Sequence, residues 1–194
     1  MDIPTMTAKP AFMDGKSGLT GQERGILTHF VLQHLDLGRI SSIQDIQDQI
    51  QGMVEKELIH EGEAHGVDIP GLMAFFSSPL GQRIRKADRV YREVPFNLVK
   101  RAEDVLPHLD GEEDPCREEI LIQGVIDCYF EEGGDLVLVD YKTDYYHSEA
   151  MKQRIIQNYR SQIQLYREAL EKIQGKRVKE SYLYLFHQNE EVLI

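Results

Sequence analysis

The sequence has little cysteine, an excess of acidic over basic residues, and no long apolar run. Two cysteines in 194 residues are too few for a disulfide framework, a four-cysteine zinc site or an iron–sulfur cluster. No apolar run approaches the ~20 residues that cross a bilayer, and the N-terminus lacks the basic and then apolar pattern of a signal peptide. We therefore expect a reduced, cytoplasmic, globular protein with no membrane association.

Positive charge is scarce, with 22 Lys and Arg against 33 Asp and Glu and a formal net charge of −11. The acidic excess is local, because residues 101–140 hold 13 acidic and 2 basic residues while the rest of the chain is close to neutral. A nucleic-acid-binding module is normally basic. Composition alone therefore gives no indication of a nucleic-acid partner.

The length suits one domain with a proper core. Residues 1–19 lack hydrophobic periodicity and are predicted to be a linker segment, followed by a single domain over residues 20–194. Within that domain Thr20 and Glu23 form a capping box, which predicts a helix start. The apolar face expected on that helix comprises Ile26, Leu27, Phe30, Val31 and Leu35.

Helical and strand patterns alternate through the rest of the domain. Further helices are predicted after Ser42, from Pro70, from Pro79, and over residues 149–174 with Gly175 as the stop. Strand patterns cover residues 89–97, 120–130, 136–141, 181–186 and 191–194. This order predicts a mixed α/β fold, with a small sheet flanked by helices.

A predicted hairpin brings two carboxylates together. Gly133 and Gly134 lie between two apolar runs, which predicts a two-residue turn in which both positions tolerate positive φ. That register places Asp127 directly opposite Asp140, and opposed residues have Cβ atoms about 4.5–5.5 Å apart. Lys142 lies two residues beyond Asp140 and shares its face of the strand.

Two facing carboxylates inside an apolar hairpin repel each other and require compensating positive charge. Lys142 supplies one charge, and a divalent cation such as Mg²⁺ or Mn²⁺, which prefers oxygen ligands, would supply two. A structural Asp–Lys ion pair and a metal site are both consistent with this pattern at this point.

Four segments in order resemble motifs of the PD-(D/E)XK nucleases, in the RecB-like branch that includes the nuclease domains of AddAB-type helicase–nucleases. The first two are Glu23–Gln33, with a histidine at position 29, and Gly124–Asp127. The other two are Val139–Asp144, which contains Asp-Tyr-Lys, and Tyr159–Tyr166, which contains a Gln-x-x-x-Tyr pair. This resemblance implies a restriction-endonuclease-like core.

The resemblance also implies roles for particular residues. It assigns His29, Asp127, Asp140 and the backbone carbonyl of Tyr141 as ligands of Mg²⁺, for which Mn²⁺ would substitute. Lys142 would join the two aspartates as the catalytic set, orienting the attacking water and stabilising negative charge. The remaining pair, Gln162 and Tyr166, would position the nucleic acid strand. Without the resemblance, His29 and Tyr166 would be interpreted as core residues, and Glu93 either as a carboxylate supporting the metal ligands or as a solvated side chain.

The implied function is metal-dependent hydrolysis of DNA phosphodiester bonds during double-strand-break repair. The substrate would be single-stranded or unwound DNA, with a helicase domain elsewhere in a longer chain and an AddB-like partner subunit. The alternatives are a catalytically inactive nuclease fold that binds DNA or a partner, a free-standing nuclease, and, on weaker grounds, a structural zinc protein. Candidate phosphate contacts, which could equally be solvated faces, are Arg83, Arg85, Lys86, Arg89, Arg92, Lys152, Arg154 and Arg160.

Overall fold

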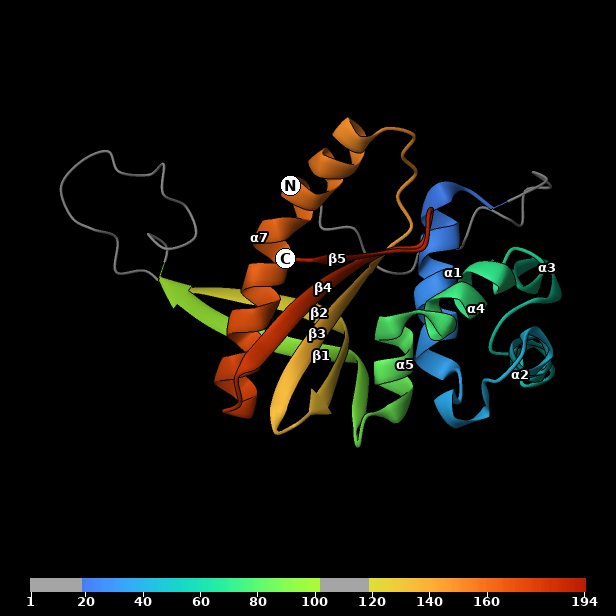
Figure 1. Ribbon diagram of the computed structural model, residues 1–194, viewed down its shortest axis with the longest axis horizontal. Coiled ribbons are helices and arrows are strands. Elements are labelled where there is room, and N and C mark those ends of the chain that lie inside the picture. The colour runs from blue at the N-terminus through green and yellow to red at the C-terminus, as the bar shows by residue number, and fades with distance from the viewer. Residues whose placement is uncertain (1–18, 102–118) are drawn as a thin grey trace. The chain divides into compact units, whose positions relative to one another are not determined.

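The computed structural model describes residues 19–101 and 119–194 (Figure 1). These residues belong to two compact units, residues 1–70 and residues 71–194. The predicted linker, apart from Leu19, and most of the acidic stretch, with Cys116, lie outside the described residues. None of the helices in the described part of the chain combines the length and the hydropathy needed to cross a bilayer.

The first unit is helical, and two capping boxes define its longest helices. Thr20 caps α1 by accepting from the Glu23 N–H, and Ser42 caps α2 by accepting from the Asp45 N–H. Both helix starts were predicted from the sequence and are confirmed. The elements of this unit are α1 (Gly21–His34), the 3₁₀ helix η2 (Leu37–Arg39), α2 (Ile43–Glu55) and α3 (Glu61–Ala64).

The buried face of α1 differs from the predicted face at one position. Leu27, Val31 and Leu35 are buried as expected, but Ile26 is 64% exposed, so its predicted place in the core is wrong. Successive residues on a helix point about 100° apart, so Ile26 and Leu27 cannot both lie at the centre of one apolar stripe. Leu32 is buried on the other side of that stripe.

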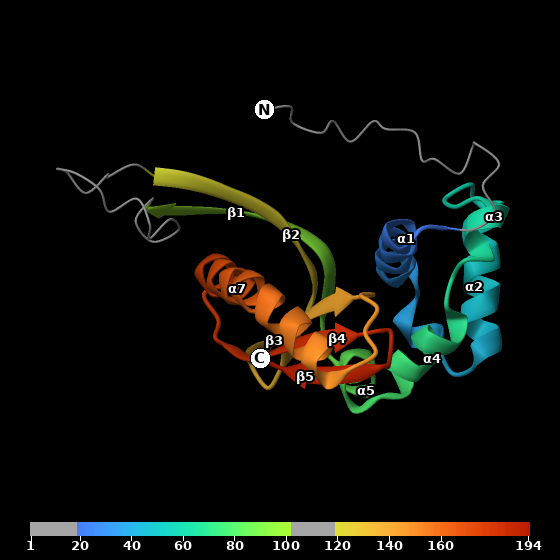
Figure 2. The same cartoon turned by 90° about the horizontal axis from the view of Figure 1, so that it is seen from above.

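The second unit contains one five-stranded mixed sheet with strand order β1-β2-β3-β4-β5. All neighbouring pairs are antiparallel except β3 and β4, which are parallel. Figure 2 shows the β1–β2 pair curving away from the other three strands. The predicted mixed α/β fold is confirmed. The elements are α4 (Ile69–Ser77), which begins at the boundary between the units, α5 (Pro79–Lys86), β1 (Val90–Arg101), β2 (Glu119–Glu132), β3 (Asp135–Lys142), α7 (Glu149–Gln174), β4 (Val178–Leu185) and β5 (Glu190–Leu193).

The β2–β3 hairpin has the predicted turn and register. Gly133 and Gly134 have φ of +64° and +90°, as a two-residue turn of this kind requires. The pairing runs from Glu132↔Asp135 to Cys128↔Val139. Asp127 and Asp140 are the next residues on the two strands, immediately beyond the last pair.

Each face of this sheet has its own helical cover. On one face, alternate residues of β3 such as Leu136 and Leu138 belong to a core cluster with Ile156 and Ile163 of α7. On the other face, the Phe75 ring of α4 packs against the rings of Tyr141, Tyr184 and Phe186, with centroid distances of 5.4, 4.6 and 5.6 Å. Because side chains alternate along a strand, Asp140 shares the α7 face with Leu138.

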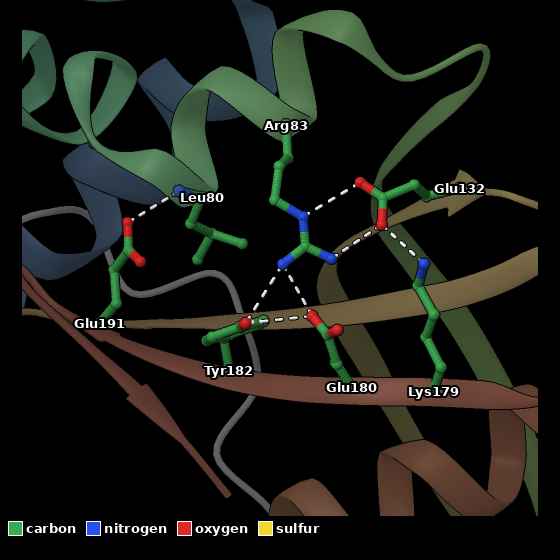
Figure 3. Close-up of polar contacts among 7 residues, drawn as sticks. All are labelled: Leu80, Arg83, Glu132, Lys179, Glu180, Tyr182 and Glu191. Carbon is green, nitrogen blue, oxygen red and sulfur yellow. Dashed lines mark hydrogen bonds and ion pairs between the residues drawn. The ribbon is translucent and has the colours of Figure 1, made fainter.

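An ion-pair network connects α5 to the ends of β2 and β4 (Figure 3). Arg83 donates to both carboxylate oxygens of Glu132, at 3.0 and 2.8 Å, and lies 2.7 Å from Glu180. Lys179 adds a second cation at 2.6 Å from Glu132. Arg83 therefore has carboxylate partners inside the protein, which argues against its use as a phosphate contact.

Candidate metal centre

Asp127 lies on β2 where that strand leaves β3 and continues beside β1 alone. Its side chain is only 8% exposed, and Oδ2 accepts a hydrogen bond from the Tyr141 backbone N–H at 2.8 Å. This hydrogen bond joins β2 to β3 beyond the last ladder pair. It also fixes the orientation of the carboxylate, so a second oxygen is held in a defined place.

Asp140 and Lys142 form a buried ion pair on β3. Lys142 Nζ lies 2.8 Å from Asp140 Oδ2, and the two side chains are 14% and 0% exposed for the lysine and the aspartate. The predicted shared face of these residues is thus present. The Lys142 ammonium also lies 4.4 Å from the centre of the Tyr159 ring on α7, a cation–π distance.

Lys142 stays cationic in this environment. Burial lowers its pKa, but the charge and hydrogen bond of Asp140 and the charge of Asp127 outweigh burial, so the pKa lies above its usual value. A protonated ammonium donates hydrogen bonds and stabilises negative charge, whereas it cannot accept a proton. The arrangement suits an electrostatic role better than a general-base role.

Glu93 on β1 adds a third carboxylate, whose role the sequence alone left open. The β1–β2 register pairs Arg92 with Cys128 and Val94 with Ile126, which puts Glu93 opposite Asp127. Carboxylate oxygens of Glu93 and Asp127 lie within 4.8 Å of each other. Glu93 also has φ of +51° within a strand, a strained conformation for a residue with a Cβ and one that clusters at functional sites.

Helix α7 contributes polar groups beside these carboxylates. Gln162 Nε2 donates to the Tyr166 hydroxyl at 2.6 Å, and Tyr159 donates to the Asp144 carboxylate at 3.3 Å. Burial raises the pKa of Tyr166, the hydrogen bond from Gln162 lowers it, and the charge of Asp140 raises it further. Gln162 and Tyr166 therefore touch each other, and Tyr166 lies within electrostatic range of the carboxylates.

His29 lies on α1 in the first unit, where its side chain is half-buried. Because the carboxylates belong to the second unit, ligation by His29 stays a prediction from the resemblance. The same holds for the Tyr141 carbonyl. The remaining predicted site residues are Asp127, Asp140, Lys142, Gln162 and Tyr166, which all belong to the second unit, where the contacts above relate them to one another.

The donor chemistry fits a hard divalent ion. Glu93 and Asp127 provide closely spaced carboxylate oxygens, and oxygen donors of this kind suit Mg²⁺ and Mn²⁺. Carboxylates this close repel unless a cation lies between or beside them. Cys128 is no competing ligand, since its side chain is fully buried and burial raises its pKa to about 12.

Comparison with known proteins agrees with this geometry. Residues 12–193 match the PD-(D/E)XK nuclease superfamily. Proteins whose name describes one subunit of an ATP-dependent helicase/nuclease are similar along nearly the whole chain. The one from Alkaliphilus oremlandii is 47% identical over 190 residues, covering 98% of this chain and 16% of that protein.

Two further relatives carry the same name. The protein from Ruminiclostridium cellulolyticum is 47% identical over 182 residues, covering 94% of this chain and 14% of the relative. The protein from Clostridium novyi is 41% identical over 194 residues, covering 100% of this chain and 16% of the relative. The chain thus spans about a sixth of the length of the curated relatives it matches. By sequence and by fold, it belongs to the PD-(D/E)XK nuclease superfamily.

Proposed function

We propose that this chain is a Mg²⁺-dependent deoxyribonuclease module that cuts single-stranded or unwound DNA. The buried Lys142–Asp140 pair beside the carboxylates of Asp127 and Glu93 carries this proposal. Two aspartates and a lysine held in this way are costly to bury. A chain that only bound DNA or a partner would have no use for them, so the inactive alternative is not favoured.

The residues divide into three roles in this proposal. Asp127 and Asp140 hold the divalent ion, with His29 and the Tyr141 carbonyl as further ligands from the resemblance and Glu93 added from its position. When bound, the ion supplies a Lewis acid and lowers the pKa of a coordinated water. Lys142 donates to the negative charge that develops on the phosphate.

Gln162 and Tyr166 act on the strand rather than on the reacting atoms. Their hydrogen bond joins two side chains one turn apart on α7, which gives the Gln162 amide and the Tyr166 hydroxyl a fixed relative orientation. We propose that these groups position the DNA strand beside the carboxylates. Replacing Gln162 by Ala is expected to weaken DNA binding more than it slows cleavage at saturating DNA.

The larger assembly is proposed from the relatives. Their name combines a helicase and a nuclease, and this chain matches about a sixth of their length. We propose that it is the nuclease module of such a protein and acts as an exonuclease in double-strand-break repair with an AddB-like partner. A motor that delivers the strand would compensate for weak intrinsic DNA binding by a chain of net charge −11.

The test is cleavage of end-labelled single-stranded DNA by the purified chain with Mg²⁺ or Mn²⁺, with EDTA, and by Asp140→Ala. We expect cleavage by the parent alone, and none in EDTA or by the variant. Equal cleavage by Asp140→Ala would overturn the assignment. Asp135→Ala is a matched control, since Asp135 begins the same strand beside the turn and has no proposed role.

A further inference from the structure

Tyr145 is conspicuous because it is exposed. It is 67% exposed, and it is the one exposed Tyr or Phe among residues 19–101 and 119–194. The adjacent tyrosine, Tyr146, is 2% exposed and belongs to the core cluster under α7. The short segment after β3 therefore turns one tyrosine into the protein and the one before it out to solvent.

The exposed ring is held by other rings rather than left free to rotate. Its centroid lies 4.3 Å from that of His187, at an interplanar angle of 54°, and 6.2 Å from that of His147. His187 in turn packs edge-on against the buried Tyr146, at 5.3 Å and 74°. A buried anchor thus supports a small exposed aromatic platform formed by Tyr145, His187 and His147.

The platform is attached to the same edge of the sheet as Lys142. Strands β3 and β4 are parallel, so Lys142 and Leu185 end their strands at one edge, and the platform residues follow soon after (Figure 1). The Phe186 N–H donates to the Lys142 carbonyl at 2.9 Å. Gln188 Nε2 donates to the Tyr146 carbonyl at 3.4 Å. These two hydrogen bonds tie the β4–β5 turn to the segment that carries Tyr145.

An exposed, supported ring beside a phosphodiester-cleaving centre suits a nucleobase. Bases of a single strand are unpaired and stack on aromatic side chains, an interaction that needs no positive charge. That matters in an acidic chain whose Arg83 and Lys152 are already engaged by carboxylates. We propose that Tyr145, backed by His187, stacks against an unpaired base of the DNA strand that occupies the metal centre. This inference rests on the proposed nuclease function, which places the strand there.

The test compares DNA with and without bases. Binding is measured for the parent, Tyr145→Ala and Tyr145→Phe, using oligothymidylate and an abasic oligomer of the same length and charge. Lys142→Ala is present in all samples to prevent cleavage. We expect Tyr145→Ala to weaken binding of oligothymidylate about tenfold, Tyr145→Phe to restore it, and neither change to affect the abasic oligomer. The same factor is expected at low and high salt, because stacking releases no counterions.

A second measurement observes the stacking directly. The chain contains no tryptophan, so Tyr145→Trp introduces a single fluorophore at the platform. Its emission is expected to change on addition of oligothymidylate and to stay constant with the abasic oligomer. Ile173→Ala is the control for loss of an exposed apolar side chain, since Ile173 is 52% exposed near the C-terminal end of α7.

The outcomes separate this inference from the proposed function. Cleavage by the parent, with equal oligothymidylate binding by Tyr145→Ala, overturns the platform and leaves the nuclease assignment intact. Equal weakening on both oligomers also overturns it, since the contact would then be to the backbone. Binding that depends on Tyr145 in a chain that never cleaves keeps the platform and overturns the nuclease. If the chain neither binds nor cleaves single-stranded DNA, both proposals fall.

Discussion

Lys142 Nζ lies 2.8 Å from Asp140 Oδ2, and the Asp140 side chain has no solvent exposure. A buried ion pair of this kind gives little net stability over an apolar pair of similar size, but breaking it by removing one partner is costly. Its retention at the edge of the sheet, beside Asp127, is best explained by chemistry. This relationship makes stability and activity respond differently to mutation.

Lys142→Met is expected to abolish cleavage and also to lower the free energy of unfolding by about 3 kcal/mol, because the Asp140 charge loses its cation. Urea denaturation in EDTA measures the second effect. The double variant Lys142→Met/Asp140→Asn is the control. It is expected to recover most of the lost stability and to remain inactive. A double variant as unstable as Lys142→Met would contradict this account of the pair.

Glu93→Gly is expected to raise stability and to lower activity. Glycine adopts φ near +51° without strain, and strain of this kind costs on the order of 1–3 kcal/mol. We therefore expect a gain of about 1 kcal/mol in the free energy of unfolding in EDTA, with weaker activation by Mg²⁺. Glu93→Ala separates the two effects, since it removes the carboxylate and keeps the strained backbone. A loss of stability in Glu93→Gly would show that the positive φ is not strained.

Arg83→Met tests whether the α5 network is structural. Arg83 contacts two carboxylates and the Tyr182 hydroxyl, but these groups are partly exposed, so we expect a loss of only about 1–2 kcal/mol in unfolding free energy. Cleavage and its salt dependence should be unchanged. Arg85→Met, on the exposed side of the same helix, serves as the control. A smaller salt dependence of DNA binding in Arg83→Met would indicate a phosphate contact instead.

The same network predicts a pH dependence of stability. Hydrogen bonds from Arg83 and Lys179 outweigh burial and lower the pKa of Glu132 from 4.5 to about 2. A lowered pKa stabilises the fold above the unfolded-state value and ceases to do so as pH falls through the folded-state value. The stability difference between the parent and Glu132→Gln should therefore be full above about pH 4.5 and shrink toward pH 2. A difference independent of pH over that interval would contradict the ion pair.

Two glycine substitutions should have opposite effects. A Cβ at Gly81 on α5 would lie 2.0 Å from the backbone oxygen of Phe75, whereas a Cβ at Gly52 on α2 would have no neighbour within 4 Å. Gly81→Ala is expected to lower the free energy of unfolding by about 3 kcal/mol or more. Gly52→Ala is expected to raise it by about 1 kcal/mol, because alanine favours helix. Urea denaturation followed by circular dichroism measures both.

The hairpin shows where sequence was sufficient. A two-residue turn at Gly133 and Gly134 has few geometries, and each allows one register. The pairing of β2 with β3, and hence the proximity of Asp127 to the Asp140 strand end, could be predicted from it. Helix α7 was predictable for a similar reason, because Ser148 and the positive φ of Gly175 (+63°) mark both ends.

Glu93 shows where sequence was insufficient. Its position opposite Asp127 depends on the register of β1 against β2, and a long segment without a diagnostic turn separates those strands. No local rule fixes such a register. The aromatic platform was missed for a related reason, because the Tyr145–His187 contact joins the ends of two parallel strands that are far apart in sequence. Ile26 was misplaced because periodicity alone does not determine the centre of a helical stripe.

The most direct test of the metal centre is Mn²⁺ binding, followed by electron paramagnetic resonance of the free ion, in the parent and in Asp127→Asn. The asparagine keeps the size of the side chain and removes one negative charge, so the fold should persist. We expect tight Mn²⁺ binding by the parent and a loss of affinity of at least about tenfold in the variant. Equal Mn²⁺ binding by the two proteins would contradict a metal centre built on these strands.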